Sequence, residues 1–294
     1  MNALSQTYFM PLLKEISIED KPLFDAIAKA YPTKSCERCF SNIFMWKRDN
    51  MRFYTEQNRI FAYHISDKYL QYPIGADIAP EELMRHIKQL RDSGYPVKYV
   101  FDANPKYFQL YPNAVEYFNA QQTEDDYDYI YQNQNIVSLK GIKLRKKHNL
   151  IRQFQRNNPD YVVEVPQGAN FAEFREYMLQ RAVSEELLPM QNAFEFFDKL
   201  HLMPLVLKDE HGQIVAGAIM GEINDSIYSV HYEKFEKEIH GAAQCIVLHE
   251  AEFLLKNGIS EMNREQDLGL EHLRQAKESW APSEMFKRLN LVEV

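Results

Sequence analysis

The order of helix-type and strand-type segments occurs twice along this chain of 294 residues. Each half opens with helical periodicity, continues with short strand-type segments, and ends with alternating helices and strands. In the first half we expect these elements at residues 18–30, 40–47, 51–54, 59–65, 69–72, 80–91, 97–101, 104–110, 115–119 and 127–131. In the second half we expect them at residues 141–156, 161–165, 171–184, 193–201, 204–209, 214–222, 226–231, 241–256, 259–263, 270–278 and 289–294. The pattern predicts two copies of one α+β fold.

The length supports this duplication, because a chain of this size exceeds what one hydrophobic core usually holds and favours domains of about 150 residues. We expect an N-terminal domain at residues 1–135 and a C-terminal domain at residues 136–294 that opens with the helix 141–156. Hydrophobic residues make up 45% of the chain, with 18 Tyr and 18 Phe, which excludes wholesale disorder.

The chain has no apolar run that approaches the roughly 20 residues needed to span a bilayer. Residues 1–16 lack a basic leader followed by an apolar segment and a cleavage site, so they do not predict a secretory signal. We therefore expect a cytoplasmic protein without a transmembrane segment.

The three cysteines are too few for a disulfide scaffold. Cys36 and Cys39 have the C-x-x-C spacing of a zinc knuckle or a redox pair. A structural zinc site needs two more soft ligands, and the sequence has no second cysteine pair. We therefore expect no metal site, and a structural role for Cys36, Cys39 and Cys245.

A basic window lies between the two halves, at residues 139–159. It carries a charge of +7 with no acidic residue, which leaves −15 for the rest of a chain whose net charge is −8. Helical geometry places Arg145, Asn149, Arg152 and Arg156 along one face, because their spacings are 4, 3 and 4. We call these four residues the basic stripe.

The basic stripe, together with Lys143 and Lys146, is a candidate binding site for an anion, because guanidinium groups bind phosphate oxygens in a two-pronged fashion. The ligand class stays open between RNA, a nucleotide cofactor and an anionic lipid headgroup. The alternative is a solvated face that balances the acidic residues 124–128.

Polar residues follow two strand-type segments of the second half. One group begins at His231, and the other is NREQDLG at residues 263–269. Polar groups at strand ends, where a sheet meets the start of helices, are favoured positions for ligands and chemistry. Glu233, Glu265 and Asp267 are the candidate catalytic residues, because neighbouring carboxylates can hold an ammonium group or accept a proton from a nucleophile.

The candidate substrate-binding residues beside these carboxylates are His231, Arg264, Arg274 and Lys277. The alternative is a network of surface salt bridges in which Asp267 caps the helix expected at residues 270–278. The sequence shows no Ser-His-Asp order and no glycine-rich phosphate-binding motif.

Five phrases of the sequence together resemble the DUF2156 family, which is related to the catalytic domain of phosphatidylglycerol lysyltransferases. They are CFSNIFMW at residues 39–46, LKGIKLRKKHN at 139–149, HYEK at 231–234, NREQDLG at 263–269 and LRQAKES at 273–279. The resemblance covers nearly the whole chain. It implies two tandem domains of the GCN5-related N-acetyltransferase (GNAT) fold, as in the Fem transferases, each a mixed, mostly antiparallel sheet flanked by helices.

The resemblance also implies an activity, the transfer of an aminoacyl group from a charged tRNA to a lipid hydroxyl or to a peptide or small-molecule amine. It makes the basic stripe a candidate for the phosphates of the donor's acceptor stem. It makes Glu233, Glu265 and Asp267 candidates for binding the donor's α-ammonium group. Such chemistry needs orientation and stabilisation of the oxyanion more than a potent base.

An acyl-CoA donor is the alternative within the same fold, and a non-catalytic module that binds RNA or another anion is a third hypothesis. Acetyltransferases of this fold bind pyrophosphate with a loop before the central helix, and the corresponding stretch here contains Gly241 and Ala243. Glu238 stands in that stretch where the family pattern has a donor side chain, which disfavours pyrophosphate.

Overall fold

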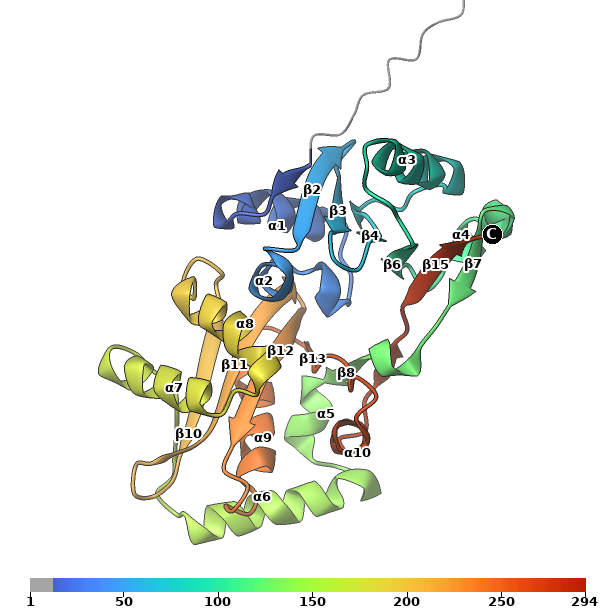
Figure 1. The fold of residues 1–294 in the computed structure, drawn as a ribbon. Helices are drawn as coiled ribbons and strands as arrows, with labels where there is room; N and C mark the ends of the chain where they lie inside the picture. The colour runs from blue at the N-terminus through green and yellow to red at the C-terminus, as the bar shows by residue number, and fades with distance from the viewer. Residues whose placement is uncertain (1–12) are drawn as a thin grey trace, which may run out of the picture. The chain divides into compact units, whose positions relative to one another are not determined.

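The computed structural model describes residues 13–294, so most of the segment inspected for a secretory signal lies outside the described residues. The chain forms two compact units, each built on one mixed sheet with helices against it (Figure 1). The predicted fold class, α+β with mixed, mostly antiparallel sheets, is confirmed. Within residues 13–294, no helix has the length and apolar character needed to cross a membrane.

The two units are discontinuous in sequence. The first contains the described residues up to Tyr31, with Lys47–Gln122 and Arg288–Val294, and the second contains Pro32–Trp46 and Thr123–Lys287. The predicted boundary between residues 135 and 136 stays a prediction about two copies of one fold. Three segments lie on the other side of that boundary from their compact unit. Residues 32–46 and 123–135 belong to the second unit, and residues 288–294 belong to the first.

The first unit contains an eight-stranded sheet in which β4 pairs with β6 in parallel and all other pairings are antiparallel. Its strands are β1 (Lys14–Glu15), β2 (Met51–Glu56), β3 (Arg59–His64), β4 (Tyr69–Gln71), β5 (Ile74–Gly75), β6 (Tyr99–Ala103), β7 (Phe118–Gln121) and β15 (Leu289–Glu293). Its helices are α1 (Lys21–Ala30), α3 (Pro80–Asp92) and α4 (Tyr107–Leu110). The β2–β3 hairpin turns at Gln57 and Asn58, whose φ angles of 49° and 60° suit the turn type that matches strand twist.

The second unit contains a seven-stranded sheet in the order β14-β8-β13-β12-β11-β10-β9. Its strands are β8 (Asp128–Gln132), β9 (Val162–Glu164), β10 (Met203–Lys208), β11 (Ile214–Asn224), β12 (Ile227–Phe235), β13 (Glu261–Asn263) and β14 (Glu284–Phe286). β12 and β13 pair in parallel from Ile227 to Ser229, and β12 then continues without β13. This end of the parallel pair places the polar residues that follow both strands near each other.

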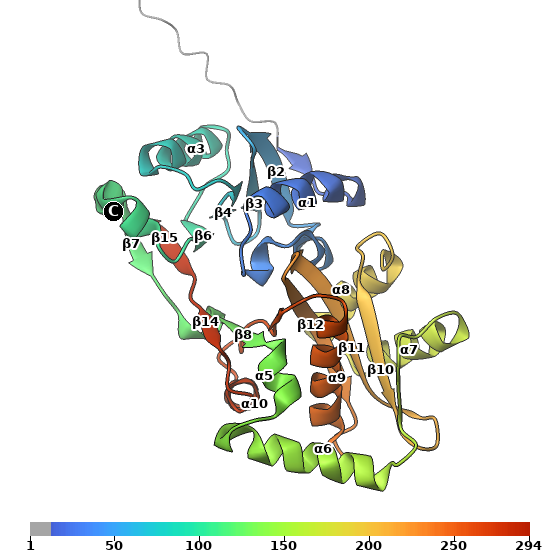
Figure 2. The same cartoon turned by 180° about the vertical axis from the view of Figure 1, so that it is seen from behind.

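Helices cover both faces of the second sheet (Figures 1 and 2). They are α2 (Phe40–Asn42), α5 (Asn133–Ser138), α6 (Arg145–Asn157), α7 (Ala169–Gln180), α8 (Ser184–Glu195), α9 (Ala242–Lys256) and α10 (Glu271–Glu278). Ala216, Ala218 and Met220 of β11 join the core formed with α9 and α6. Gly217, between them, faces Phe174 of α7 on the opposite side. Successive residues of β11 thus contact different helical layers, as the alternation of side chains along a strand requires.

Two strands belong to sheets other than those expected. Residues 127–131 are expected to close the first sheet, but β8 pairs with β13 and β14 in the second unit. Residues 289–294 are expected in the second sheet, but β15 lies between β6 and β7 in the first. In each sheet the exchanged strand pairs with one member of the parallel pair, β13 in the second sheet and β6 in the first. The error has a physical reason, because an apolar strand suits the interior of either sheet and its pattern does not specify the partner.

One helix is also displaced from its expected position. The sequence pattern predicts residues 171–184 and 193–201, whereas the structure has α7 ending at Gln180 and α8 spanning Ser184–Glu195. α8 contains Pro189 inside the helix, which the rule that proline ends helices does not anticipate. This difference lies away from the candidate site residues.

Candidate functional site

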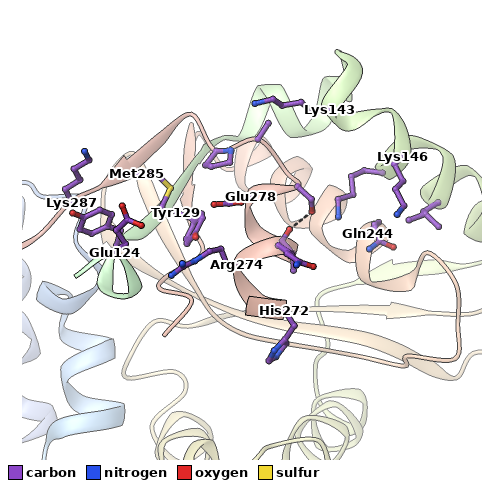
Figure 3. A pocket seen from close by; sticks show the side chains of 18 residues that line it. Glu124, Tyr129, Lys143, Lys146, Gln244, His272, Arg274, Glu278, Met285 and Lys287 are labelled. Carbon is purple, nitrogen blue, oxygen red and sulfur yellow. Dashed lines mark hydrogen bonds between the residues drawn. The ribbon is translucent and has the colours of Figure 1, made fainter. Parts of the chain in front are cut away.

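A pocket of about 1150 Å³ opens in the second unit, beside the start of α6 (Figure 3). The side chains that give it a basic character are Lys143, Lys146, Lys147, Arg274 and Lys287. Glu124 and Glu278 are its acidic members, and the buried residues Tyr127 and Tyr129 lie behind its surface. Clustered lysine and arginine side chains are typical of sites that bind phosphates. We call this cavity the basic pocket.

The start of α6 contributes one of its faces to the basic pocket. Lys143 of the preceding 3₁₀ turn η6 (Ile142–Leu144), Lys146, Lys147 and Leu150 line it at spacings of 3, 1 and 3, which is one helix face. Burial of Ile151 and Phe154 in the core fixes this orientation. α6 therefore presents lysines to the basic pocket and anchors itself with its apolar side.

The basic stripe lies on a different face of α6. Arg145, Asn149, Arg152 and Arg156 are all exposed, and none of them lines the basic pocket. The structure thus separates the predicted anion-binding residues into two groups, with Lys143 and Lys146 in the basic pocket and the stripe on the outer surface. A role of the stripe in binding a large anion stays a prediction.

The first turn of α9 also reaches the basic pocket, through Gln244. The positive end of a helix attracts anions, so it adds to the field of the lysines. Gly241, directly before α9, has φ of +89°, and a Cβ there would lie 2.2 Å from the backbone oxygen of Leu150. This glycine lets α6 pack closely on α9. Gly241 is consequently buried and Ala243 half-buried, and their predicted role at a phosphate stays a prediction.

Glu233 forms an ion pair with Arg264 beyond the end of the parallel strand pair. Arg264 Nε donates to Glu233 Oε2 at 3.1 Å, and Arg264 Nη2 donates to the same oxygen. Behind them lies Glu250 of α9, fully buried, and neither of its carboxyl oxygens has a hydrogen-bond partner among the described residues. Burial, reinforced by Glu233, raises the pKa of Glu250 well above its usual range. Burial therefore favours the neutral form of Glu250.

Two lysines flank this ion pair. Burial, reinforced by the charge of Arg264, lowers the pKa of both Lys277 and Lys147 to about 8. Lys277 Nζ donates to the backbone oxygen of Gln266. Lys147 also lines the basic pocket, so the pocket and the Glu233–Arg264 pair are electrostatically coupled through it.

Asp267 is buried and fully occupied by partners. Its carboxylate accepts hydrogen bonds from Arg274 Nε at 2.9 Å, the Tyr129 hydroxyl at 2.6 Å and the Gly269 N–H at 2.8 Å. Burial acts to raise the pKa of Asp267, but these hydrogen bonds outweigh it and lower the pKa to about 2. Arg274 Nη2 also binds Asp125 at 2.5 Å. This arrangement fixes the loop before α10; the predicted catalytic role of Asp267 stays a prediction.

The helix cap offered as the alternative role of Asp267 is wrong in its details. α10 begins after Leu270, which provides no side-chain cap, and Asp267 binds the Gly269 N–H ahead of the helix. The sequence placed the carboxylate near the helix start correctly but not its backbone partner, because a cap and a loop-stabilising aspartate have the same local pattern.

His231 and Glu265 meet on the other side of the same strand ends. His231 Nδ1 lies 2.8 Å from Glu265 Oε1, which also accepts a hydrogen bond of 2.7 Å from the Ser229 hydroxyl. In the pairing of β11 with β12, Ile219 lies opposite Tyr232 and Met220 opposite Val230, so His231 is the extra residue of a β-bulge. A bulge redirects side chains locally.

One contact of this group was not anticipated. Ser41 Oγ lies 3.1 Å from His231 Nε2, although the two residues are 190 positions apart in the chain. Ser41 belongs to the segment Pro32–Trp46, which packs in the second unit. The sequence alone gives no sign of this contact, because a serine-histidine pairing across such a separation depends on the path of the chain.

Two cysteines of the same segment are buried, and their structural role stays a prediction. Cys36 and Cys39 are buried among Ile130, Ile223 and Ile227. Burial raises the pKa of the Cys39 thiol to about 12, which disfavours the thiolate needed for redox chemistry or metal binding.

Among the described residues, one cluster has side chains of the metal-ligand type at short mutual distances: Glu56, Glu82 and His86 in the first unit. Arg85 Nη2 lies 2.6 Å from Glu56 Oε1 and 2.9 Å from His86 Nε2. The Arg85 guanidinium group already balances the charge of Glu56 and Glu82. These three side chains therefore do not favour binding of a metal cation.

Comparison with known protein families shows what this chain is related to. A family model described as phosphatidylglycerol lysyltransferase, C-terminal, matches residues 28–289. The chain belongs to this family. No match was found among the curated proteins. Family membership confirms the resemblance read from the sequence and supports a relationship to aminoacyltransferases.

Solved structures agree on the fold. A conserved protein of unknown function from Bacteroides thetaiotaomicron VPI-5482 is 24% identical, with a TM-score of 0.86 over 97% of this chain and 100% of that chain. L-PGS from Bacillus licheniformis is 15% identical, with a TM-score of 0.67 over 95% and 92%. FemX is 9% identical, with a TM-score of 0.64 over 96% and 97%. At these identities the likeness establishes the fold alone.

Proposed function

We propose that this protein transfers an aminoacyl group from a charged tRNA to the amine or hydroxyl of an acceptor, which is a lipid headgroup, a peptide or a small molecule. In this reaction the acceptor atom bonds to the ester carbonyl carbon and the bond from that carbon to the ribose oxygen breaks. The acceptor loses one proton and the ribose oxygen gains one. The reaction therefore needs no oxidant, metal or further cofactor to balance.

The basic pocket is the observation that carries this proposal. The 3′ end of a tRNA presents phosphates and a terminal base. Lys143, Lys146 and Lys147 on one face of the α6 region supply charge for these phosphates. A volume of about 1150 Å³ exceeds the range of ordinary small-molecule sites, as a nucleotide terminus with its amino acid requires.

The residues at the strand ends support the transfer step. Arg264 and Lys277 are cations next to the point where β12 and β13 cease to pair. Cations in a buried site stabilise the oxyanion of a tetrahedral intermediate. Glu233 provides a carboxylate for the α-ammonium group of the donor, as the family resemblance implies.

The test is transfer of a radiolabelled amino acid from bulk charged tRNA to hydroxylamine and to extracts of lipids and peptides. We expect labelled product with the wild type and at least tenfold less with Lys143→Ala/Lys146→Ala. The matched control is Lys29→Ala, which removes a lysine from α1 in the first unit. Label transfer that is equal in both variants would refute the basic pocket as the donor site, and acetyl transfer from acetyl-CoA without aminoacyl transfer would refute the proposal.

A further inference from the structure

We propose that Ser41, His231 and Glu265 form a hydrogen-bonded relay in which Ser41 and His231 orient Glu265 to accept the proton of the acceptor nucleophile. This inference rests on the proposed function for the reaction, but the relay itself is a statement about three side chains. Glu265 is the catalytic residue in this proposal, and Ser41 and His231 are positioning residues. Ser41 comes from the segment Pro32–Trp46, far from the other two in sequence.

The three side chains form one continuous line of contacts. Ser41 Oγ lies 3.1 Å from His231 Nε2, and His231 Nδ1 lies 2.8 Å from Glu265 Oε1. A carboxylate only accepts, so Nδ1 of a neutral His231 carries the proton and donates it to Glu265. Nε2 then has a free lone pair and accepts the hydroxyl proton of Ser41. One tautomer of His231 satisfies both contacts.

The backbone around His231 leaves room for its contacts with Ser41 and Glu265. A Cβ at position 221 of β11 would lie 2.6 Å from His231 Nε2 and 3.0 Å from Ser41 Oγ, so only a glycine leaves room for the contact. The β-bulge at His231 directs the imidazole to this place. The imidazole itself has no exposed surface. Its position is thus fixed on all sides, as a positioning group requires.

Glu265 has one oxygen held and one oxygen free. Oε1 binds His231 and Ser229, whereas Oε2 has no hydrogen-bond partner among residues 13–294. The side chain is 18% exposed, so solvent or a substrate can reach it. Glu265 also has φ of +56°, a conformation that costs energy for a residue with a Cβ and that concentrates at functional sites.

The proton transfer follows from this arrangement. When the acceptor attacks the ester carbonyl, its proton moves to Glu265 Oε2. The same proton then moves to the ribose oxygen as the carbon–oxygen bond breaks, which returns Glu265 to its carboxylate form. His231 keeps its Nδ1 proton throughout and stabilises the charge of Oε1. The relay gains and loses no proton over the cycle.

Serine, histidine and glutamate also occur together in enzymes whose serine is the nucleophile. Here Ser41 is buried, so the reactive residue is Glu265 and not the serine. Ser41 is 4% exposed, and its hydroxyl also lies 3.5 Å from Cys39 Sγ. The accessible polar atom belongs to Glu265. A covalent aminoacyl-Ser41 intermediate would therefore contradict this proposal, and intact-protein mass spectrometry after mixing with charged tRNA detects it.

The relay can be tested without any substrate, by NMR of the full-length protein with ¹⁵N-labelled histidine. The signal of His231 is assigned by its loss in His231→Gln. We expect the Nδ1–H tautomer at pH 7 and a shift of the Nε2 resonance in Ser41→Ala. The control is Ser35→Ala, which removes another fully buried hydroxyl from the same segment and should leave the His231 signals unchanged. An Nε2–H tautomer or a doubly protonated ring would overturn the relay.

The catalytic part is tested by the kinetics of aminoacyl transfer. We expect Glu265→Gln to lower kcat about 100-fold, the size of a general-base contribution, with KM for charged tRNA within about twofold. Ser41→Ala should lower kcat about fivefold, as for one lost hydrogen bond, and Ser35→Ala should match the wild type. Unchanged kcat in Glu265→Gln would overturn the inference while the proposed function stands. If the wild type transfers no aminoacyl group but His231 has the expected tautomer, the proposed function is refuted. The hydrogen bonds of the relay are then still supported.

Discussion

At the scale of single residues, Asp267 is the most heavily bonded carboxylate of the site region. Its side chain is buried and binds Arg274, Tyr129 and Gly269. We expect Asp267→Asn to lower the free energy of unfolding by about 2 kcal/mol, because it removes the buried negative charge that accepts these hydrogen bonds and leaves Arg274 with Asp125 as its remaining carboxylate partner. Urea unfolding at pH 7 measures this, and Asp160→Asn, on an exposed residue, is the control.

The same residue predicts a pH dependence. The pKa of Asp267 is about 2 in the folded protein and 3.8 ordinarily, so the folded state favours the carboxylate. Its contribution is complete above pH 4 and is lost as the pH falls towards 2. The difference in stability between wild type and Asp267→Asn should therefore shrink over this range. A difference that stays constant from pH 5 to pH 2 would show that the ion pair does not hold the loop.

Lys277 predicts a second pH dependence, of the same sign, at high pH. Its pKa is about 8 in the folded protein and 10.5 ordinarily, so between these values the unfolded chain binds more protons than the folded one. The free energy of unfolding then rises with pH, by up to about 1 kcal/mol per pH unit from this residue. Urea unfolding at pH 8, 9 and 10 should show a smaller rise for Lys277→Met than for the wild type. Identical slopes would refute the lowered pKa.

The sequence located most of these residues but not their roles. It singled out His231, Glu233, Arg264, Glu265 and Lys277, and the structure groups them at the end of one parallel strand pair. It missed Ser41, because that contact depends on the path of the segment Pro32–Trp46. It did not mark Glu250 as a site residue, because His249 and Glu252 beside it are also polar and only burial distinguishes Glu250.

At the scale of elements, α6 presents two basic faces with separate predicted roles. Lys143 and Lys146 line the basic pocket, whereas Arg145 and Arg152 are exposed on the stripe. The salt dependence of tRNA binding is the slope of the logarithm of the binding constant against the logarithm of the salt concentration. We expect Arg145→Ala/Arg152→Ala to reduce the magnitude of this slope by about 2, which is about 1 for each lost phosphate contact with duplex RNA. Filter binding between 50 and 300 mM salt measures the slope. An unchanged slope would make the stripe an ordinary solvated face.

Periodicity predicted α6 well but not the division of its charges. The pattern fixes which residues share a face, and the stripe was identified from that alone. Which face meets a cavity depends on neighbours that are distant in sequence, here α10 and the start of β8. The sequence therefore predicts which residues share each face of α6. Only the fold shows that the face with Lys143 and Lys146 lines a pocket.

At the scale of the whole molecule, the two sheets exchange strands between the two halves of the chain. β15 pairs with both β6 and β7, so it is an interior strand of the first sheet. We expect deletion of residues 288–294 to expose the backbone of these strands, and hydrogen exchange of β6 and β7 should rise by at least tenfold. The control is substitution of Val294 by Ala, which lies beyond β15. Unchanged protection would show that β15 is not required by the first sheet.

The duplication itself was predictable, but the exchange was not. Repetition of helix and strand patterns along the chain indicated two α+β copies, and both sheets have the expected mixed character. Strand pairing between segments more than a hundred residues apart leaves no local signal, because β8 and β15 are apolar strands that either sheet could accommodate. The pairing register is a property of the folded chain.

The most direct test of the central claim is the affinity of the purified protein for charged tRNA against deacylated tRNA, with acetyl-CoA as competitor. The proposed function predicts tighter binding of the charged form, weaker binding of both forms to Lys143→Ala/Lys146→Ala, and no displacement by acetyl-CoA. Equal affinity for both forms of tRNA, or displacement of tRNA by acetyl-CoA at the basic pocket, would contradict it.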